Sequence, residues 1–431
     1  MSQLTNFPMD IKNTVDHAFV REMNLSSVLR SIYSEAPLSR AQLAAKTGLN
    51  KSTISSLVED LLDRKLIHET GINYVGTGRP ATQLEINSNV GAVVGVELGV
   101  DFVAVVLADF KGKIIERKQI NADPAASQEK TFIPTRALIE EMVQKCNELG
   151  LKVLGLSFSI PGTVDLEKGI LIFAPNLQWH NVPFRELFSR STGLKVFIEN
   201  DANAAALAEH LFGVAKNLKD FIFVFAGVGL GGGLFLNGQL YRGKGGYAGE
   251  IGHTPIIEDP FQKPCHCGNL GCWETYANQY SVVERVQIRL ETKRSNLISS
   301  LMEKQNAPLS ILIIKQAAEM GDTDALECLA EAGMALGNGI AGLVNIFNPE
   351  KIILGGPISI AGDFLLPSIK QSVNKRAMPE IVIQTEINIS AFGTDASVIG
   401  AVAVVVDDIL TNPIHIEKEV VPAKVLDPIS T

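Results

Sequence analysis

Hydrophobic positions in the first part of the chain follow the spacing of helices. One helix face is marked by Leu25, Val28, Leu29, Ile32 and Tyr33. A second helix starts at Ser39, because Gln42 three residues later completes a capping box, and it ends at Gly48. A third helix buries Ile54, Leu57, Val58, Leu61 and Leu62. Residues before about Val20 lack this periodicity and are expected to form a mobile arm.

The second and third helices are joined by a turn containing glycine, which is typical of a helix-turn-helix, although an ordinary pair of packed helices has the same pattern. Two short strands, 66–68 and 83–86, then flank a polar loop and predict a wing. Arg79 in that loop could enter a DNA minor groove, or it could be a solvated linker residue. The candidate DNA contacts are Arg40, Lys51, Ser52, Thr53, Ser55, Ser56 and Arg79.

From Gly91 onward the pattern changes to long apolar strands. Strands are expected at 92–96, 103–107, 114–116 and 153–158, with a helix at 132–149. Further on, the expected elements are strands at 221–225, 233–236 and 351–354, helices from 275 to 347, and a last helix at 396–409. Hairpins that give way to alternating strands and helices predict an α/β protein. Residues from Asn412 are expected to be a loose tail.

Composition adds few constraints. The 431 residues are 46% hydrophobic and 20% charged with a net charge of −9, which allows two or three ordinary domains. Residues 1–90 hold nine basic and nine acidic residues, so the acidic excess lies in the remainder. There is no run of about twenty apolar residues and no signal-like start. We therefore expect a cytoplasmic protein without a membrane span.

The stretch from Gly249 to Glu274 carries the most specific chemistry. Cys265, Cys267 and Cys272 lie within eight residues, and His253 could complete a Cys3His zinc shell. The spacing differs from that of DNA-reading zinc fingers, so a compact loop closed by zinc fits better. A disulfide, or a plain core histidine, would be the alternative, but disulfides are rare in a reducing cytosol.

Glu250-x-Gly252-His253 followed by Cys265-x-Cys267-Gly268-x-x-Gly271-Cys272-x-Glu274 resembles the signature of the ROK family of repressors and sugar kinases. The resemblance extends from about Leu25 to the helix after Ala396, and the run Gly95–Asp101 is most similar to the xylose-repressor branch. It implies a structural zinc and an actin-like (ribonuclease H-like) α/β fold after an N-terminal winged helix-turn-helix. The implied divisions are 1–88 for DNA binding, 89–200 for a first lobe completed by the helix near 395–411, 201–394 for a second lobe with the zinc loop, and 412–431 for a tail.

The resemblance also implies a sugar site. The segment Glu199-Asn200-Asp201-Ala202-Asn203 matches the part of family kinases that supplies the catalytic base, although an Asn-Asp pair before a helix is more often only an N-cap. The implied sugar contacts are Gly162, Asn176, Asn200, Asp201, Glu250, His253 and Glu274.

The phosphate side departs from the kinase pattern. Family kinases carry Asp-x-Gly-x-Thr, whereas this chain has Glu97-x-Gly99-x-Asp101, which places a carboxylate where a hydroxyl should meet an anion. The second phosphate loop should read Gly-Thr-Gly, and Val228 replaces its threonine. We therefore expect a repressor without kinase activity.

Such a repressor would have operator DNA and a sugar inducer as partners, and by half-site logic it would be a homodimer or a dimer of dimers. Sugar binding would change operator affinity by roughly 1–3 kcal/mol. The alternatives are a sugar kinase that carries a DNA-binding domain, or a repressor controlled by a protein partner.

Overall fold

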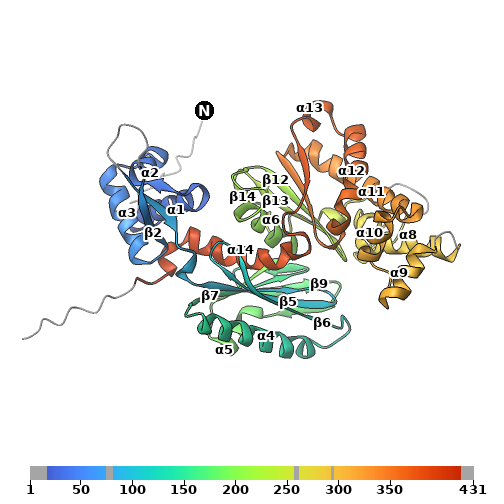
Figure 1. Ribbon diagram of the computed structural model, residues 1–431, viewed down its shortest axis with the longest axis horizontal. Coiled ribbons are helices and arrows are strands. Elements are labelled where there is room, and N and C mark those ends of the chain that lie inside the picture. Colours follow the sequence, from blue (N-terminus) through green and yellow to red (C-terminus); the bar gives the residue numbers. More distant parts are fainter. Residues whose placement is uncertain (1–16, 74–80, 257–261, 293–295, 419–431) are drawn as a thin grey trace, which may run out of the picture. The chain divides into compact units, whose positions relative to one another are not determined.

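The computed structural model describes residues 17–73, 81–256, 262–292 and 296–418 (Figure 1). These residues form two compact units. The smaller unit holds the chain up to Asn87 and from Asp407 onward, and the larger unit is Ser88–Val406.

Three helices and a small sheet form the N-terminal part of the smaller unit. They are α1 (His17–Glu35), α2 (Arg40–Thr47), α3 (Lys51–Asp63), β1 (Leu38–Ser39), β2 (Ile67–Asn73) and β3 (Ala81–Ile86). The sheet order is β1-β3-β2, with antiparallel pairing. The expected capping box at Ser39 and Gln42 is present, and Gly48 ends α2 with φ 72°.

Two expectations for this unit need correction. Helix α1 starts at His17, so residues 17–20 are helical rather than part of an arm. Their side chains are exposed, which explains why they show no apolar periodicity. Strands β2 and β3 are also longer than expected, because polar residues occupy the outward positions of an antiparallel pair.

The last turns of α14 (Ala396–Thr411) and the residues after it belong to the smaller unit. Arg30 on α1 pairs with Asp407 at 2.7 Å, and the hydroxyl of Ser26 donates to the carbonyl of Leu410 at 2.8 Å. Beyond Asn412, where we expected a loose tail, Arg64, the C-cap residue of α3, donates to the carbonyl of Ile414 at 3.2 Å. The described part of the C-terminal segment is therefore hydrogen-bonded to α3.

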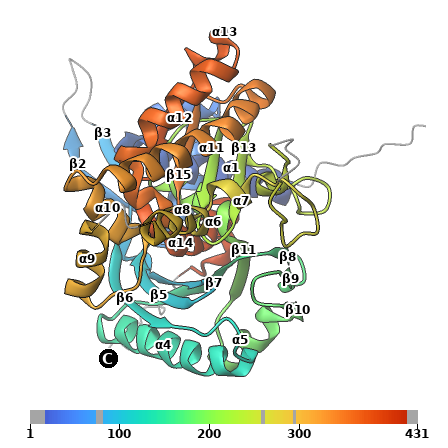
Figure 2. The same cartoon turned by 90° about the vertical axis from the view of Figure 1, so that its right-hand side faces the viewer.

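The first lobe of the larger unit is a five-stranded sheet of order β11-β7-β4-β5-β6. Its elements are β4 (Ala92–Leu98), β5 (Phe102–Asp109), β6 (Ile114–Asn121), β7 (Val153–Ile160), β11 (Val196–Asn200), α4 (Gln128–Glu148) and α5 (Phe184–Thr192). Helices α4 and α5 cover one face (Figure 2). On this face the rings of Phe132, Phe158, Phe184 and Phe188 pack against one another in edge-to-face, tilted and stacked arrangements. A small sheet, β8 (Thr163–Asp165), β9 (Ile170–Ala174) and β10 (Trp179–Val182), extends this lobe.

The second lobe has its own sheet, of order β14-β13-β12-β15-β16. Its strands are β12 (Phe221–Ala226), β13 (Leu230–Leu236), β14 (Gln239–Leu240), β15 (Lys351–Gly355) and β16 (Glu386–Ile389). Helix α6 (Asp201–Leu211) packs against β12 and β13 and also reaches β7 and β11 of the first lobe. Gly233 permits this approach, because a Cβ there would lie 2.5 Å from Ala206.

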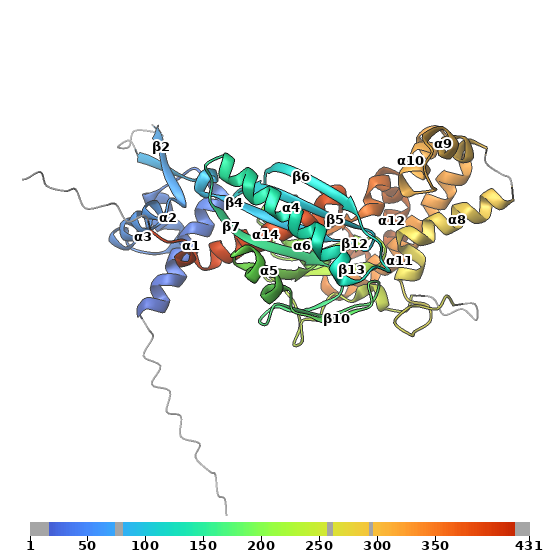
Figure 3. The same cartoon turned by 90° about the horizontal axis from the view of Figure 1, so that it is seen from below.

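A helical layer completes the second lobe. It consists of α7 (Glu274–Ala277), α8 (Gln279–Glu291), α9 (Leu297–Gln305), α10 (Ile311–Glu319), α11 (Thr323–Phe347), α12 (Gly362–Arg376) and α13 (Pro379–Val382). Helices α8, α9 and α10 gather at one end of the larger unit (Figure 3). Within the described ranges, α11 is long and apolar enough to cross a membrane, but 56% of that stretch is buried inside the protein, as expected of a core helix.

Candidate functional site

A cleft of ≈ 600 Å³ opens in the larger unit, between the elements of its two lobes. All seven candidate sugar contacts line it: Gly162, Asn176, Asn200, Asp201, Glu250, His253 and Glu274. They come from segments more than a hundred residues apart in the chain. The structure therefore brings together what the sequence motifs list separately, while their sugar-binding role stays a prediction.

Asn200 and Asp201 lie where β11 ends and α6 begins. Asn200 is the N-cap of α6, since its side-chain oxygen accepts from the backbone N–H groups of Ala202 and Asn203. Its amide nitrogen donates to the carbonyl of Gly162 at 3.0 Å. Asn200 thus acts structurally and holds the Gly162 turn, whereas Asp201 faces the cleft at the first position of the helix.

The cleft is strongly acidic. Burial raises the pKa of Asp201 to about 7, and the charge of Glu250 adds to this effect. Burial also raises the pKa of Glu97 to about 8, and repulsion by the charge of Asp201 is the next largest cause. A wall of carboxyl groups that are hard to ionise suits a neutral, hydroxyl-rich ligand, which can donate hydrogen bonds to them, better than an anion.

The expected phosphate-binding turns line the same cleft. Glu97 is only 6% exposed and receives a hydrogen bond from Ser397, while Asp101 lies exposed at the turn after β4. In the second loop the carbonyl of Val228 accepts from the side-chain amide of Asn278 at 2.8 Å. An exposed carboxylate and an apolar side chain are both unsuitable partners for an anion, and the expectation that these turns do not bind phosphate stays a prediction.

The four candidate zinc ligands are also close together. The ligand atoms of His253, Cys265, Cys267 and Cys272 all lie within 4.8 Å of one another. Cys267 Sγ is 3.7 Å from Cys272 Sγ, and His253 Nδ1 is 3.5 Å from Cys265 Sγ. A tetrahedral zinc with bonds of about 2.0–2.3 Å requires ligand separations of about 3.3–3.8 Å. The cluster can therefore bind a metal ion, and its donor set fits zinc.

His253 faces both the cysteines and the cleft. While Nδ1 points at Cys265, Nε2 lies 3.8 Å from the Glu250 carboxylate. One ring nitrogen could therefore bind zinc while the other contacts a sugar hydroxyl, which is compatible with both roles expected of this residue.

The ion pair between Glu199 and Arg242 near the cleft could not be predicted from any sequence motif. Glu199 is 2% exposed in its side chain and pairs with Arg242 at 2.6 Å. Its other oxygen accepts from the N–H of Asn200 at 3.0 Å, so the pair holds the strand end that presents Asp201. Arg242 lies beyond the hairpin turn in the second lobe, and only the fold reveals that it reaches β11.

The described candidate DNA contacts lie in the smaller unit. At the start of α3, Lys51 and Ser52 are exposed, and the Ser52 hydroxyl donates to Asn50 at 2.7 Å. Thr53 and Ser55 are half-buried on the same helix. Two candidates have partners on other elements: Ser56 accepts from Arg21 of α1 at 3.4 Å, and Arg40 pairs with Glu69 of β2 at 2.8 Å. Arg79 lies outside the described residues.

Comparisons with known proteins agree with this geometry. The ROK family model matches residues 93–408. The xylose repressor of Caldicellulosiruptor bescii is 33% identical over 399 residues, covering 92% of this chain and 99% of that protein. Among solved structures, a ROK family transcriptional regulator described as a homologue of the Escherichia coli Mlc protein has a TM-score of 0.78 at 30% identity, covering 92% of this chain and 98% of that one.

A ROK glucokinase from Streptomyces griseus, solved with glucose and AMPPNP, has a TM-score of 0.65 at 29% identity, covering 73% of this chain and 99% of that one. The expected fold, a helical N-terminal domain followed by an actin-like sugar-kinase fold, is confirmed by these likenesses. The chain belongs to the ROK family.

Proposed function

We propose that this protein is a sugar-responsive transcriptional repressor of carbohydrate utilisation genes. The observation that carries the proposal is the convergence of seven candidate sugar contacts on one cleft, in a chain that also has a helix-turn-helix unit. The match with a relative named as a xylose repressor, and with the solved ROK transcriptional regulator, covers nearly the whole length of each. The likeness therefore includes the N-terminal helices as well as the lobes that form the cleft.

In this proposal the cleft binds the inducer through hydrogen bonds to its hydroxyl groups. Asp201, Glu250 and Glu274 act as acceptors, and His253 contributes the ring nitrogen that faces the cleft. A structural zinc held by His253, Cys265, Cys267 and Cys272 would keep this wall in place. Xylose is the first sugar to test, because two of the relatives are named xylose repressors.

Operator DNA would be bound by α3 in the major groove, with Arg79 in the minor groove. Two such units in a homodimer, or four in a dimer of dimers, would match a two-fold operator in the cytoplasm. Sugar binding would change operator affinity through the coupling of the two equilibria.

Sugar kinase activity is the second candidate, because Asp201 is the first residue of α6, where the family resemblance implies a catalytic base. Against it stand Asp101 and Val228, which line the cleft in the two turns that would be expected to hold the nucleotide phosphates of a kinase. Control by a protein partner, with the cleft unused, is the third.

One experiment separates the three functions. Operator fragments are first selected from a random DNA library with purified protein, and their affinity is then measured with each of a panel of pentoses, hexoses and N-acetylated sugars. If the protein is a sugar-responsive repressor, its affinity for the operator DNA changes when one class of sugar is added. A kinase consumes ATP with that sugar, and a partner-controlled repressor binds DNA with no response to any sugar.

A further inference from the structure

Glu274, which lines the cleft, is the first residue of α7, a helical segment that is not stable without contacts to its surroundings. Helix α7 is a single turn, Glu274–Ala277, which is too short to be stable alone. The last carbonyl groups of such a turn also lack partners within the helix. The position of the Glu274 carboxylate therefore depends on what surrounds α7.

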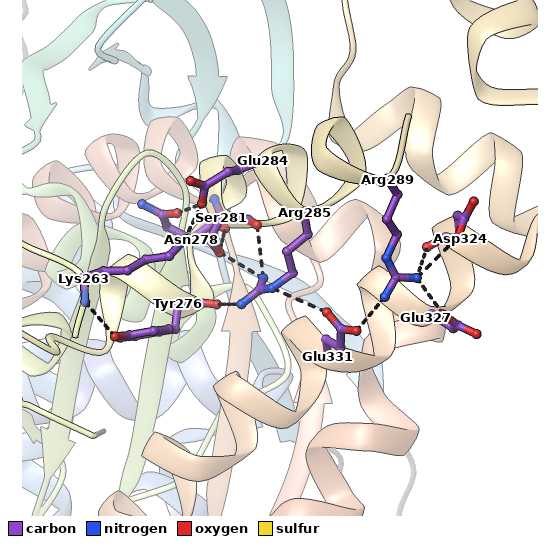
Figure 4. A network of polar contacts seen from close by, with 10 residues as sticks. All are labelled: Lys263, Tyr276, Asn278, Ser281, Glu284, Arg285, Arg289, Asp324, Glu327 and Glu331. Atoms are coloured by element: carbon purple, nitrogen blue, oxygen red, sulfur yellow. Dashed lines mark hydrogen bonds and ion pairs between the residues drawn. The ribbon is translucent and has the colours of Figure 1, made fainter. Parts of the chain in front are cut away.

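Arg285 on α8 supplies one of these supports, and its side chain points toward Tyr276 (Figure 4). Its Nη2 donates to the carbonyl of Tyr276 at 2.6 Å, which satisfies one of the free carbonyls of α7. Its Nη1 donates to the carbonyl of Ser281 at 3.2 Å, on its own helix. Charge-assisted bonds of this kind are among the stronger hydrogen bonds in proteins.

Tyr276 extends the support to the zinc loop. Its phenolic oxygen accepts from the backbone N–H of Lys263 at 2.9 Å, and Lys263 precedes Cys265 by two residues. Lys263 and Glu284 of α8 also form an ion pair. One tyrosine therefore connects the start of the cysteine loop, the turn that carries Glu274, and the guanidinium of Arg285.

The same helix contains a matched arginine one turn later. Arg285 lies 3.8 Å from the Glu331 carboxylate of α11, and Arg289 pairs with the same residue at 2.6 Å. Within the described residues, the ion pairs of the Arg289 side chain are all with α11: Asp324, Glu327 and Glu331. Both arginines thus connect α8 to α11, but only Arg285 also bonds to α7.

We propose that Arg285 is a positioning residue for the sugar site, which acts by holding α7 so that the Glu274 carboxylate faces the ligand. This inference rests on the proposed function of the cleft. It assigns to Arg285 a role in ligand affinity although the side chain does not line the cleft. Arg289 has no such role.

The test compares Arg285→Ala with Arg289→Ala in the full-length protein, using calorimetric titration with the sugar that the panel identifies. Arg285→Ala should weaken sugar binding roughly tenfold, equivalent to about 1.4 kcal/mol. Arg289→Ala should leave the affinity unchanged. Zinc content should stay at the wild-type level in both, because no candidate ligand is altered. Arg285→Lys retains a donor for Tyr276 and should recover part of the affinity.

A double-mutant cycle with Glu274→Gln shows whether Arg285 acts through Glu274. The combined variant should bind sugar as weakly as Glu274→Gln alone. Additive losses, equal losses in Arg285→Ala and Arg289→Ala, or wild-type affinity in a folded Arg285→Ala protein would each overturn the proposal.

Hydrogen exchange of residues 263–277 gives an answer that needs no sugar. Exchange in this segment should be faster in Arg285→Ala than in wild type or Arg289→Ala. If the wild-type protein binds no sugar of the panel, the proposed function fails, and the exchange data alone then decide whether Arg285 holds α7. Equal exchange in the three proteins would refute that as well.

Discussion

The thiol of Cys265 donates to the Glu274 carboxylate, with Sγ and Oε1 2.9 Å apart. A candidate zinc ligand therefore touches a candidate sugar contact. Ligation of zinc requires a deprotonated cysteine, so its proton would no longer be shared with Glu274. The carboxylate would then be free to accept a hydrogen bond from a sugar hydroxyl, and metal and sugar binding would be coupled.

Cys267→Ser should reduce zinc content, thermal stability and sugar affinity together. Cys267 is the exposed member of the cluster, so the substitution removes a ligand without opening a cavity in the core. Metal analysis should give about one zinc per wild-type chain and less in the variant. Retention of both zinc and sugar affinity would show that the four residues are not the metal site.

Asp201→Asn should raise the dissociation constant of the sugar by about ten- to a hundredfold, because a buried charged hydrogen bond contributes roughly 1.5–3 kcal/mol. Operator binding without sugar should change little. Unchanged induction in this variant would remove Asp201 from the sugar site.

Sugar affinity should also depend on pH through Asp201. Burial raises the pKa of this carboxyl to about 7, so the folded protein keeps its proton until about neutrality. The ionised acceptor accumulates only as the pH rises through that value, and binding should therefore tighten between about pH 6 and pH 8. Titrations across this range should show the dependence in wild type and a flatter profile in Asp201→Asn. A wild-type affinity that falls with increasing pH would contradict it.

The wild-type protein should show no sugar-dependent ATP hydrolysis above background in a coupled assay. Phosphoryl transfer depends on positioning and on stabilisation of negative charge. Asp101 would repel the nucleotide, and Val228 offers it no hydroxyl donor. Robust turnover of any sugar in the panel would show that the protein is a DNA-binding sugar kinase and not a repressor without enzymatic activity.

Substitutions on α3 and in the wing should separate two kinds of DNA contact. Lys51→Ala should weaken binding to all DNA sequences alike. It should also lower the slope of log K against log salt concentration by about one, because one phosphate contact is lost. Ser52→Ala should change which operators are preferred, since Ser52 is exposed in the first turn of α3. Arg79→Ala should weaken operator binding and leave sugar binding intact. Fluorescence anisotropy with matched and mismatched operators at several salt concentrations measures these effects. A uniform loss for Ser52→Ala would mark it as a phosphate contact.

Asp60→Asn should destabilise the smaller unit by about 1.5–3 kcal/mol at neutral pH. Burial alone would raise the pKa of Asp60, but hydrogen bonds from Arg21, Lys418 and Arg64 outweigh it and hold the pKa below the usual 3.8. The stabilisation is therefore present above the unfolded pKa and disappears as the pH falls through the folded value. Thermal unfolding at several pH values should show a deficit that shrinks in acid. Asp63→Asn, an exposed change one turn later, is the control.

Local sequence patterns were enough to predict those parts of the protein that short motifs encode. The histidine–cysteine cluster and the candidate sugar contacts were recognisable because each lies in a short motif with its own spacing, such as Cys265-x-Cys267 or Asn200-Asp201. Helices such as α3 were predictable because one face must be buried against neighbours. Element ends were less accurate, as at His17, where exposed helical residues leave no apolar pattern.

Contacts between segments that are distant in the sequence could be identified only from the folded protein. Several pairings depend on how whole elements pack. Tyr276 bonds to the N–H of Lys263 and to the guanidinium of Arg285, and Glu199 pairs with Arg242. Arg30 pairs with Asp407, which is 377 positions away in the sequence. Arginines of this kind look like ordinary helix-surface residues in a sequence, since nothing nearby in the chain indicates their partner. The burial that raises the pKa of Glu97 to about 8 is likewise a property of the assembled lobes, because a lone carboxyl in a strand carries no sign of how much water the fold will remove.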